Sequence, residues 1–409
     1  MNKTPKNMRL YIGIYGRRNA GKSSLLNTFT RQNVSLVSDY AGTTTDPVEK
    51  PMELLPLGPV LFIDTAGIDD EGDLGQLRIQ RTLQILDRTD IAILVVDHSW
   101  SKFEDEIIKS FQLKKIPYIV VLNKIDVAPY TKDILEKVKD IPYTDFSSIT
   151  KTGIEKLRSL ILSNAPAEYI ESTPIIGDLI PEQSTVILVV PIDKEAPKGR
   201  LILPQVQTIR DLLDHNVKAL VVKESELALA LSELKNPPAL VVTDSQAFDS
   251  VSKIVPVDIP LTSFSILFSR AKGDLTTQAI GTLALKKLQP KDRILIAEAC
   301  SHHPIADDIG RVKIPRLLNK YCGEVQIDIC QGHDFPQNLT DYKLVIHCGS
   351  CMFNRRETLN RIMYCTQCNV PISNYGLTIA GLLGILERAL APFPEVLEAY
   401  NNAKSIRNS

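Results

Sequence analysis

The 409-residue sequence lacks any long hydrophobic run. Its longest apolar stretches, such as 91–96 and 186–192, are far too short to cross a bilayer. No apolar segment precedes the first apolar run at Leu10, so the sequence predicts no secretory signal. We therefore expect a cytoplasmic protein that does not engage a membrane.

An excess of charge of either sign is also missing. The chain has 47 lysine and arginine residues against 48 aspartate and glutamate residues, for a formal net charge of −1. This balance argues against a broad electrostatic grip on nucleic acid, so we expect no nucleic-acid partner. The chain is too long for one ordinary hydrophobic core, and two or three domains are expected.

Cysteine is absent from the first 299 residues. All seven cysteines lie beyond them: Cys300, Cys322, Cys330, Cys348, Cys351, Cys365 and Cys368. In a reducing compartment, such clustering indicates metal or redox chemistry in one domain rather than disulfides.

The apolar pattern predicts an α/β protein with three domains. Residues 1–168 alternate short strands with helical stretches, as in a doubly wound parallel sheet, and residues 175–271 form a smaller α/β unit without a catalytic motif. We interpret that second unit as a dimerisation domain, with strands at 185–190, 219–222, 239–243 and 265–267. Residues 272–409 form a third α/β unit, again with a parallel sheet, that carries every cysteine.

A nucleotide-binding loop is the first clear motif. Residues Gly16–Ser23 match the P-loop pattern G-x-x-x-x-G-K-[ST] between an apolar strand and a helix-like stretch. In that context backbone N–H groups and a helix N-terminus cradle phosphates. Lys22 is expected to reach the β- and γ-phosphates, and the Ser23 hydroxyl to ligate Mg²⁺. The residues expected to bind phosphate are Gly16, Asn19, Ala20, Gly21, Lys22, Ser23 and Ser24.

Two further strings complete the phosphate end of this site. Asp64-Thr65-Ala66-Gly67 follows an apolar strand, where Asp64 would hold the Mg²⁺ shell and Gly67 would sense the γ-phosphate. Between the P-loop and Asp64 lies Gly42-Thr43-Thr44-Thr45-Asp46. Its position fits a first switch loop, in which Thr44 would complete the Mg²⁺ shell when GTP is bound.

The base is expected to be guanine. Asn123-Lys124-Ile125-Asp126 follows the strand at 118–122, and a carboxylate at Asp126 can accept hydrogen bonds from guanine N1 and N2. Adenine offers no such pair of donors, so ATP would leave a buried charge unpaired. Ser147-Ser148 lies where a loop would back the guanine ring.

These strings resemble the tRNA-modification and Era-like branch of translation-factor GTPases. In that branch Ile68 stands where Ras-like proteins carry a water-orienting glutamine. The family's alternative is a potassium ion, held in part by the P-loop asparagine, which corresponds to Asn19. The resemblance therefore implies K⁺-stimulated GTP hydrolysis with slow intrinsic turnover, with Asn19, Lys22 and Thr44 as the catalytic residues.

The cysteines form a second constellation. Cys300-Ser301-His302 is followed, much later, by His347-Cys348-Gly349-Ser350-Cys351. A C-x-x-C spacing brings two thiolates to one turn, and a third from a separate strand end would close a metal site. Three cysteines with nearby histidines suit either a Cys₃His zinc site or an iron–sulfur cluster that lacks a fourth cysteine.

Behind a GTPase domain and a motif-free middle domain, this C-x-H…H-C-x-x-C pattern resembles the GTPases that mature [FeFe]-hydrogenase. The resemblance implies a [4Fe-4S] cluster on Cys300, Cys348 and Cys351. It also implies a scaffold or carrier, expected to be a homodimer, for the di-iron precursor of the hydrogenase active site. Radical-SAM maturases would load this precursor, which is then delivered to the apo-[FeFe]-hydrogenase.

The fourth ligand of such a cluster stays open. His302 and His347 are candidates by spacing, and Glu298 is a third because a strand places residues 298, 300 and 302 on one face. An exchangeable fourth ligand would suit a scaffold. The alternative for the whole chain is a zinc-containing regulatory GTPase that acts on tRNA or ribosomes. A second metal site at Cys365 and Cys368 is less expected than thiols that face the core.

Overall fold

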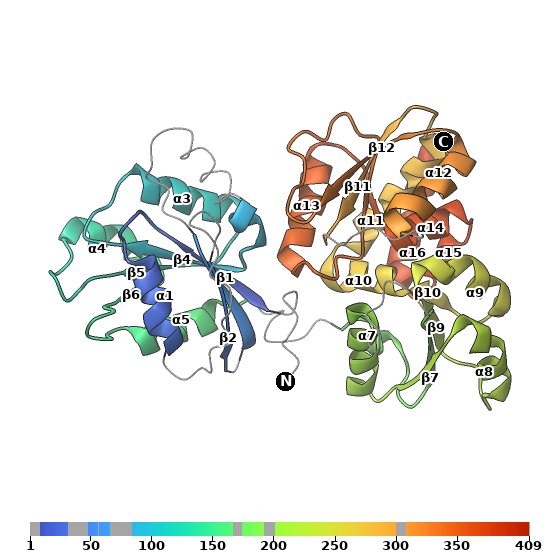
Figure 1. The fold of residues 1–409 in the computed structure, drawn as a ribbon, viewed down its shortest axis with the longest axis horizontal. Helices are drawn as coiled ribbons and strands as arrows, with labels where there is room; N and C mark the ends of the chain where they lie inside the picture. The colour runs from blue at the N-terminus through green and yellow to red at the C-terminus, as the bar shows by residue number, and fades with distance from the viewer. Residues whose placement is uncertain are drawn as a thin grey trace. The chain divides into compact units, whose positions relative to one another are not determined.

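The structure is a computed structural model, and it describes residues 9–31, 48–55, 57–65, 84–166, 174–191, 201–299 and 308–408. The chain divides into two compact units, Met1–Ser172 and Thr173–Ser409, each of which is described by itself (Figure 1). Within the described ranges, no helix is long and apolar enough to span a membrane.

The first unit is built on a six-stranded sheet in the order β2-β3-β1-β4-β5-β6. All neighbouring strands are parallel except β2, which runs antiparallel to β3. The strands are β1 (Leu10–Tyr15), β2 (Val48–Leu54), β3 (Gly58–Asp64), β4 (Ile91–Val96), β5 (Tyr118–Leu122) and β6 (Tyr143–Asp145). This is the doubly wound arrangement that the apolar pattern predicts.

Alternating strand residues divide this sheet between two helical layers. Leu10, Ile12 and Ile14 pack with residues of α1 (Lys22–Arg31) and α5 (Ile154–Asn164), whereas Tyr11 and Tyr15 pack toward the other face. That second face is covered by α3 (Lys102–Leu113) and α4 (Lys132–Val138), as Figure 1 shows. Both faces of the parallel strands are therefore dry, which explains their continuous apolar sequences.

The second unit contains two four-stranded parallel sheets. Their orders are β10-β9-β7-β8 and β12-β11-β13-β14. The strands of the first are β7 (Thr185–Val189), β8 (Lys218–Val222), β9 (Leu240–Thr243) and β10 (Leu261–Ser263). Those of the second are β11 (Arg293–Glu298), β12 (Gln326–Gln331), β13 (Leu344–His347) and β14 (Ile372–Asn374).

One hydrophobic core joins the two sheets of this unit. It includes Ile187 and Val241 from the first sheet and Ile296 and Ile346 from the second. The helices are α7 (Leu203–Asp214), α8 (Leu227–Glu233), α9 (Phe248–Ile254), α10 (Phe264–Lys272), α11 (Leu275–Gly281), α12 (Ile314–Cys322), α13 (Arg355–Gln367), α14 (Tyr375–Leu382), α15 (Leu386–Leu390) and α16 (Pro394–Asn408). The outer face of the second sheet packs in a separate, smaller core with α13.

The predicted strand at 265–267 is wrong, because these residues form the first turns of α10. The strand of that region, β10, ends at Ser263 instead, where the Ser263 hydroxyl caps the helix by accepting a hydrogen bond from the Ile266 N–H. A serine before an apolar run is a helix-start signal, and Phe264, Leu267, Phe268 and Ala271 continue it at helical spacing.

Candidate functional site

The P-loop backbone follows the end of β1 and can be built only with glycine at two positions. Gly16 has φ +146°, and a Cβ there would lie 2.4 Å from the carbonyl oxygen of Val95. Gly21 has φ +93°, and its Cβ would lie 2.1 Å from Nδ2 of Asn123. Asn19 also adopts a left-handed φ of 60°, which asparagine tolerates better than most residues. Its side chain is exposed.

The residues predicted to handle phosphate and Mg²⁺ lie together at this loop. Lys22 is buried, and its Nζ donates to the carbonyls of Gly16 and Arg17, both at 2.7 Å. The Ser23 hydroxyl donates to Oδ2 of Asp64 at 2.5 Å. The other carboxylate oxygen of Asp64 is buried without a hydrogen-bond partner among the described residues, and burial raises the pKa of this group. A hydroxyl beside an unsatisfied carboxylate oxygen fits the oxygen-rich shell that Mg²⁺ prefers.

The base-recognition loop is held against the P-loop. Nδ2 of Asn123 donates to the carbonyl of Ala20 at 2.8 Å, which ties the two loops together. The Tyr130 hydroxyl contacts the carbonyl of Asn123 at 2.5 Å, and Lys124 adopts a left-handed φ of 62°. Asp126 is exposed. Its carboxylate therefore stands open on a loop whose backbone is fixed.

The second serine loop lies beside this one. The N–H of Ile125 donates to the carbonyl of Phe146 at 3.3 Å, which puts the chain before Ser147 next to the base-recognition loop. Ser147 is buried, and its hydroxyl accepts from the N–H groups of Ile149 and Thr150. The Ser148 hydroxyl is buried without a partner among the described residues. Both serines are thus at the guanine end of the site, as predicted.

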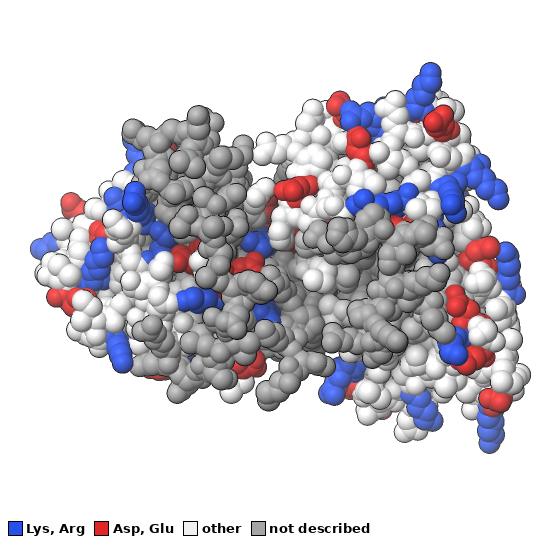
Figure 2. All heavy atoms as spheres, in the orientation of Figure 1, with Lys and Arg blue, Asp and Glu red and all other residues white. Residues whose placement is uncertain are grey.

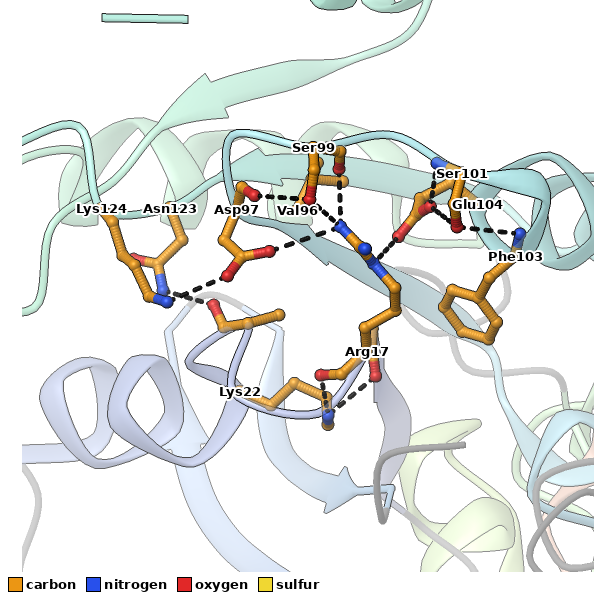
Figure 3. Close-up of polar contacts among 12 residues, drawn as sticks. Arg17, Lys22, Val96, Asp97, Ser99, Ser101, Phe103, Glu104, Asn123 and Lys124 are labelled. Atoms are coloured by element: carbon orange, nitrogen blue, oxygen red, sulfur yellow. Dashed lines mark hydrogen bonds and ion pairs between the residues drawn. The ribbon is translucent and has the colours of Figure 1, made fainter. Parts of the chain in front are cut away.

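An ion network that the sequence did not reveal links the two ends of the nucleotide site (Figure 3). Arg17 of the P-loop pairs with the fully buried carboxylate of Glu104 at 2.9 Å and with Asp97 at 3.5 Å. Asp97 in turn pairs with Lys124 at 3.0 Å. Glu104 is the N3 residue of a capping box at the start of α3, where it also accepts from Ser101. Nothing in the local sequence identifies these partners, because they lie about 80 residues from Arg17.

Several predicted site residues lie outside the described residues. They are Thr44 and Gly67 of the GTPase unit and Cys300 and His302 of the cysteine constellation. Their roles stay predictions. Ser24 is described and exposed, at the second position of α1.

The cysteine constellation is built on two neighbouring parallel strands. β11 and β13 pair with Ala297 opposite His347, so the residues that follow both strands emerge at the same edge of the sheet. The N–H of Ala299, one residue before Cys300 in sequence, donates to Sγ of Cys348 at 3.1 Å. Between Cys348 and Cys351 the chain turns through Ser350, which has a left-handed φ of 55°. The C-x-x-C loop therefore lies against the end of the strand that leads to Cys300.

A buried lysine faces this loop from α10. Lys272 is 9% exposed, and its Nζ donates to the carbonyls of Phe353 at 3.3 Å and Ser350 at 3.5 Å. Burial lowers the pKa of Lys272 to about 8, and the charges of Cys351 and Cys348 oppose that shift. In return, Lys272 opposes the effect of burial, which raises the pKa of Cys351. An ammonium ion therefore lies within electrostatic reach of both thiols.

The two described candidates for a fourth ligand lie on opposite faces of the sheet. Glu298 continues the row of Ile294 and Ile296 on the core face, whereas His347 continues that of Val345 on the outer face. Glu298 is buried, and its Oε2 accepts from Arg311 at 3.2 Å and from Gln331 at 3.1 Å.

Both ring nitrogens of His347 are already used. The Arg361 guanidinium donates to Nε2 at 3.2 Å, which leaves Nδ1–H to donate to the Cys348 carbonyl at 3.0 Å. Burial and the charge of Arg361 lower the pKa of His347 to about 3, so the ring is neutral. Of the two, Glu298 has the geometry that better suits a ligand on the core face, where Cys348 also packs.

The remaining cysteines pack as apolar residues. Cys322 packs against the large core of the unit, and Cys330, Cys365 and Cys368 against the smaller one. Burial raises the pKa of Cys365 to about 12 and that of Cys330 to about 11, so both are poor thiolates. Across the described ranges, which leave out Cys300, no group of three or more His, Cys, Asp or Glu residues could hold a metal ion.

Known proteins match the GTPase part of the chain. The tRNA modification GTPase MnmE of Aquifex aeolicus is 34% identical over 176 residues, which are 42% of this chain and 39% of that protein. GTPase Der of Campylobacter concisus is 38% identical over 166 residues, 38% of this chain and 35% of its own length. The chain thus spans less than two fifths of the curated relatives that it matches. Among solved structures, Aquifex aeolicus Era with GDP and AlF₄⁻ covers 52% of this chain and 93% of its own at 22% identity, but its TM-score of 0.33 carries no argument.

Family models account for the chain in three consecutive segments. Residues 11–124 match a 50S ribosome-binding GTPase model, so the first unit is a GTPase domain. Residues 175–273 match the hydrogen maturase F dimerization domain, and residues 274–392 match the hydrogen maturase F tetramerization domain. The two maturase models together match more than half of the chain, which indicates an oligomer. The chain belongs to the hydrogen maturase F family.

Proposed function

We propose that this protein is a GTP-hydrolysing scaffold that holds a [4Fe-4S] cluster. On it the di-iron precursor of [FeFe]-hydrogenase is assembled, or from it delivered. Radical-SAM maturases and the apo-hydrogenase are the partners that this role requires. The observation that carries the proposal is the hydrogen bond from the Ala299 N–H to Sγ of Cys348, which sets the C-x-x-C loop beside the strand that leads to Cys300.

In the GTPase domain, each residue has a role that follows from its contacts. The P-loop N–H groups and Lys22 bind the phosphates, while Ser23 and Asp64 contribute to the Mg²⁺ shell. Asp126 accepts from the guanine base, on a loop tied to Ala20 through Asn123. Thr44 and Gly67 respond to the γ-phosphate, so the presence of GTP is read by the two switch strings.

In the cluster domain, Cys300, Cys348 and Cys351 provide three thiolates. A cluster bound in this way keeps one iron for an exchangeable ligand, and cargo attaches there. Glu298 is the described residue that best suits that exchangeable position, because it shares the core face with Cys348 whereas both nitrogens of His347 are engaged.

The maturase domains also favour a homodimer. β8 is an edge strand of its sheet, and Val221 on it is 41% exposed. On the neighbouring helix α7, Val206 and Leu213 are 47% and 56% exposed. Apolar side chains at an unpaired strand edge support association with a second copy of the chain.

No observation on the described residues favours the tRNA- or ribosome-directed alternative. Lys and Arg are interspersed with Asp and Glu over the described residues on the face drawn in Figure 2. That mixture agrees with a net charge of −1 and lacks the basic stripe typical of nucleic-acid binding.

Metal content tests the proposal. The full chain is purified without oxygen, and iron, acid-labile sulfide and zinc are measured per chain. We expect a brown protein with about four irons and four sulfides, as a [4Fe-4S] cluster requires. Stoichiometric zinc, or a colourless protein that takes up no iron on reconstitution, would refute the scaffold role.

Potassium is expected to stimulate GTP hydrolysis. Asn19 is exposed at the P-loop with φ 60°, so glycine can replace it there without backbone strain. We expect turnover to be about tenfold faster in K⁺ than in Na⁺, because a fixed cation beside the phosphates stabilises developing charge. Asn19→Gly should remove that difference, whereas Asn19→Asp, which keeps an oxygen ligand, should retain part of it. Equal wild-type rates in the two salts would rule out a potassium site.

A further inference from the structure

The family models meet where α10 ends. The dimerization model covers residues up to 273, and Lys272 is the last residue of α10 within it. The cysteine loop belongs to the next model, which begins at residue 274. Lys272 therefore extends from one module into the cysteine site of the other, inside a single compact unit.

The contacts of Lys272 are not those of a lysine that packs by chance. Its ammonium group is buried and donates to two carbonyls of the cysteine loop, those of Ser350 and Phe353. The ring of Phe268 lies 5.3 Å from the same nitrogen. Among the described residues, the charged groups that act on it are the thiols of Cys351 and Cys348. A buried ammonium ion is costly unless an anion compensates for it.

We propose that Lys272 is the counter-charge of the iron–sulfur site: a positioning residue that holds the cysteine loop and raises the reduction potential of the cluster. Reduction adds one negative charge to a cluster, and a cation in a dry environment stabilises that charge. Net charge and hydrogen bonding near the sulfurs are among the main determinants of cluster potentials. This inference rests on the proposed function, because it needs the cluster to be present.

The test compares two substitutions in the full-length protein, reconstituted anaerobically. Lys272→Met keeps much of the side-chain length but removes the charge, and Lys272→Arg keeps the charge. Lys286→Met, at an exposed lysine of the same unit, is the control for the loss of one positive charge elsewhere. Folding is followed by circular dichroism, cluster content by iron and sulfide, and the midpoint potential by a redox titration read by EPR.

We expect Lys272→Met to hold a cluster whose midpoint potential is more negative than that of the wild type. Lys272→Arg and Lys286→Met should stay close to the wild-type potential. A folded Lys272→Met variant that loses the cluster while Lys272→Arg keeps it would also support a requirement for the charge. If Lys272→Met does not fold, Lys272→Gln takes its place in the same comparison.

Three results would overturn the inference. One is a fully loaded Lys272→Met or Lys272→Gln variant with the wild-type potential. Another is a loss of cluster in Lys272→Arg as complete as in the uncharged variants, which would indicate a purely steric role. The third is failure of both uncharged variants to fold, which would make Lys272 a requirement of the fold. A wild-type protein without a cluster would instead refute the proposed function itself.

Discussion

Replacing Cys351 with serine is expected to reduce bound iron from about four atoms per chain to less than about one. A serine hydroxyl stays protonated at neutral pH and is a poor ligand for iron, so the cluster would keep only two thiolates. Cys351 also lies in the loop whose carbonyls accept from Lys272, and this places its thiol beside a fixed cation. Iron and sulfide content after anaerobic reconstitution, together with visible absorbance, measures the effect.

The matched control is Cys322→Ser. The Cys322 thiol contacts the Leu318 carbonyl at 3.2 Å, a hydrogen bond that serine can also donate, and its side chain is only partly buried. This variant should keep the wild-type iron content. If Cys351→Ser were to retain a full cluster, or if both variants were to lose it equally, the assignment of Cys351 as a ligand would be wrong.

The sequence predicted the central strands of the GTPase unit to the residue. β1, β4 and β5 have the predicted bounds, because parallel strands buried on both faces read as unbroken apolar runs between polar motif residues. The same rule failed at 265–267, where a short apolar run is compatible with either a strand or a helix. Only the capping serine at position 263 distinguishes the two, and a local signal of that kind is easily outweighed by apolar content.

The sites show a similar division. Residues inside motifs could be found because their chemistry depends on local spacing: the described nucleotide-binding residues gather at the ends of β1, β3 and β5. Lys272 and Arg17 could not, because their partners lie about 80 residues away and tertiary packing alone brings them together. Adjacent residues on a strand face opposite ways, so His347 and Cys348 could have been separated from sequence alone. The engagement of His347 by Arg361 could not.

Replacing Asp126 with asparagine is expected to weaken GTP binding by about 30- to 1,000-fold, which corresponds to roughly 2–4 kcal/mol. The carboxylate offers two acceptors to guanine N1 and N2, whereas an amide has one acceptor and presents a donor to the second position. Asp126 is exposed, and its loop is fixed through Asn123 and Tyr130, so the substitution should leave the fold intact. Titration with a fluorescent guanine nucleotide measures the dissociation constant.

The direction of the change in specificity makes this experiment decisive. Xanthine carries an oxygen where guanine carries the N2 amine, so the asparagine amide can donate to it, and xanthosine triphosphate should bind the variant more tightly than GTP. Asp140→Asn, at an exposed aspartate of the same unit, should leave GTP affinity unchanged. Unaltered GTP affinity in Asp126→Asn would mean that another group reads the base. Iron content should be the same in both variants, because the cysteine site takes none of its contacts from the base-recognition loop among the residues that the structure describes.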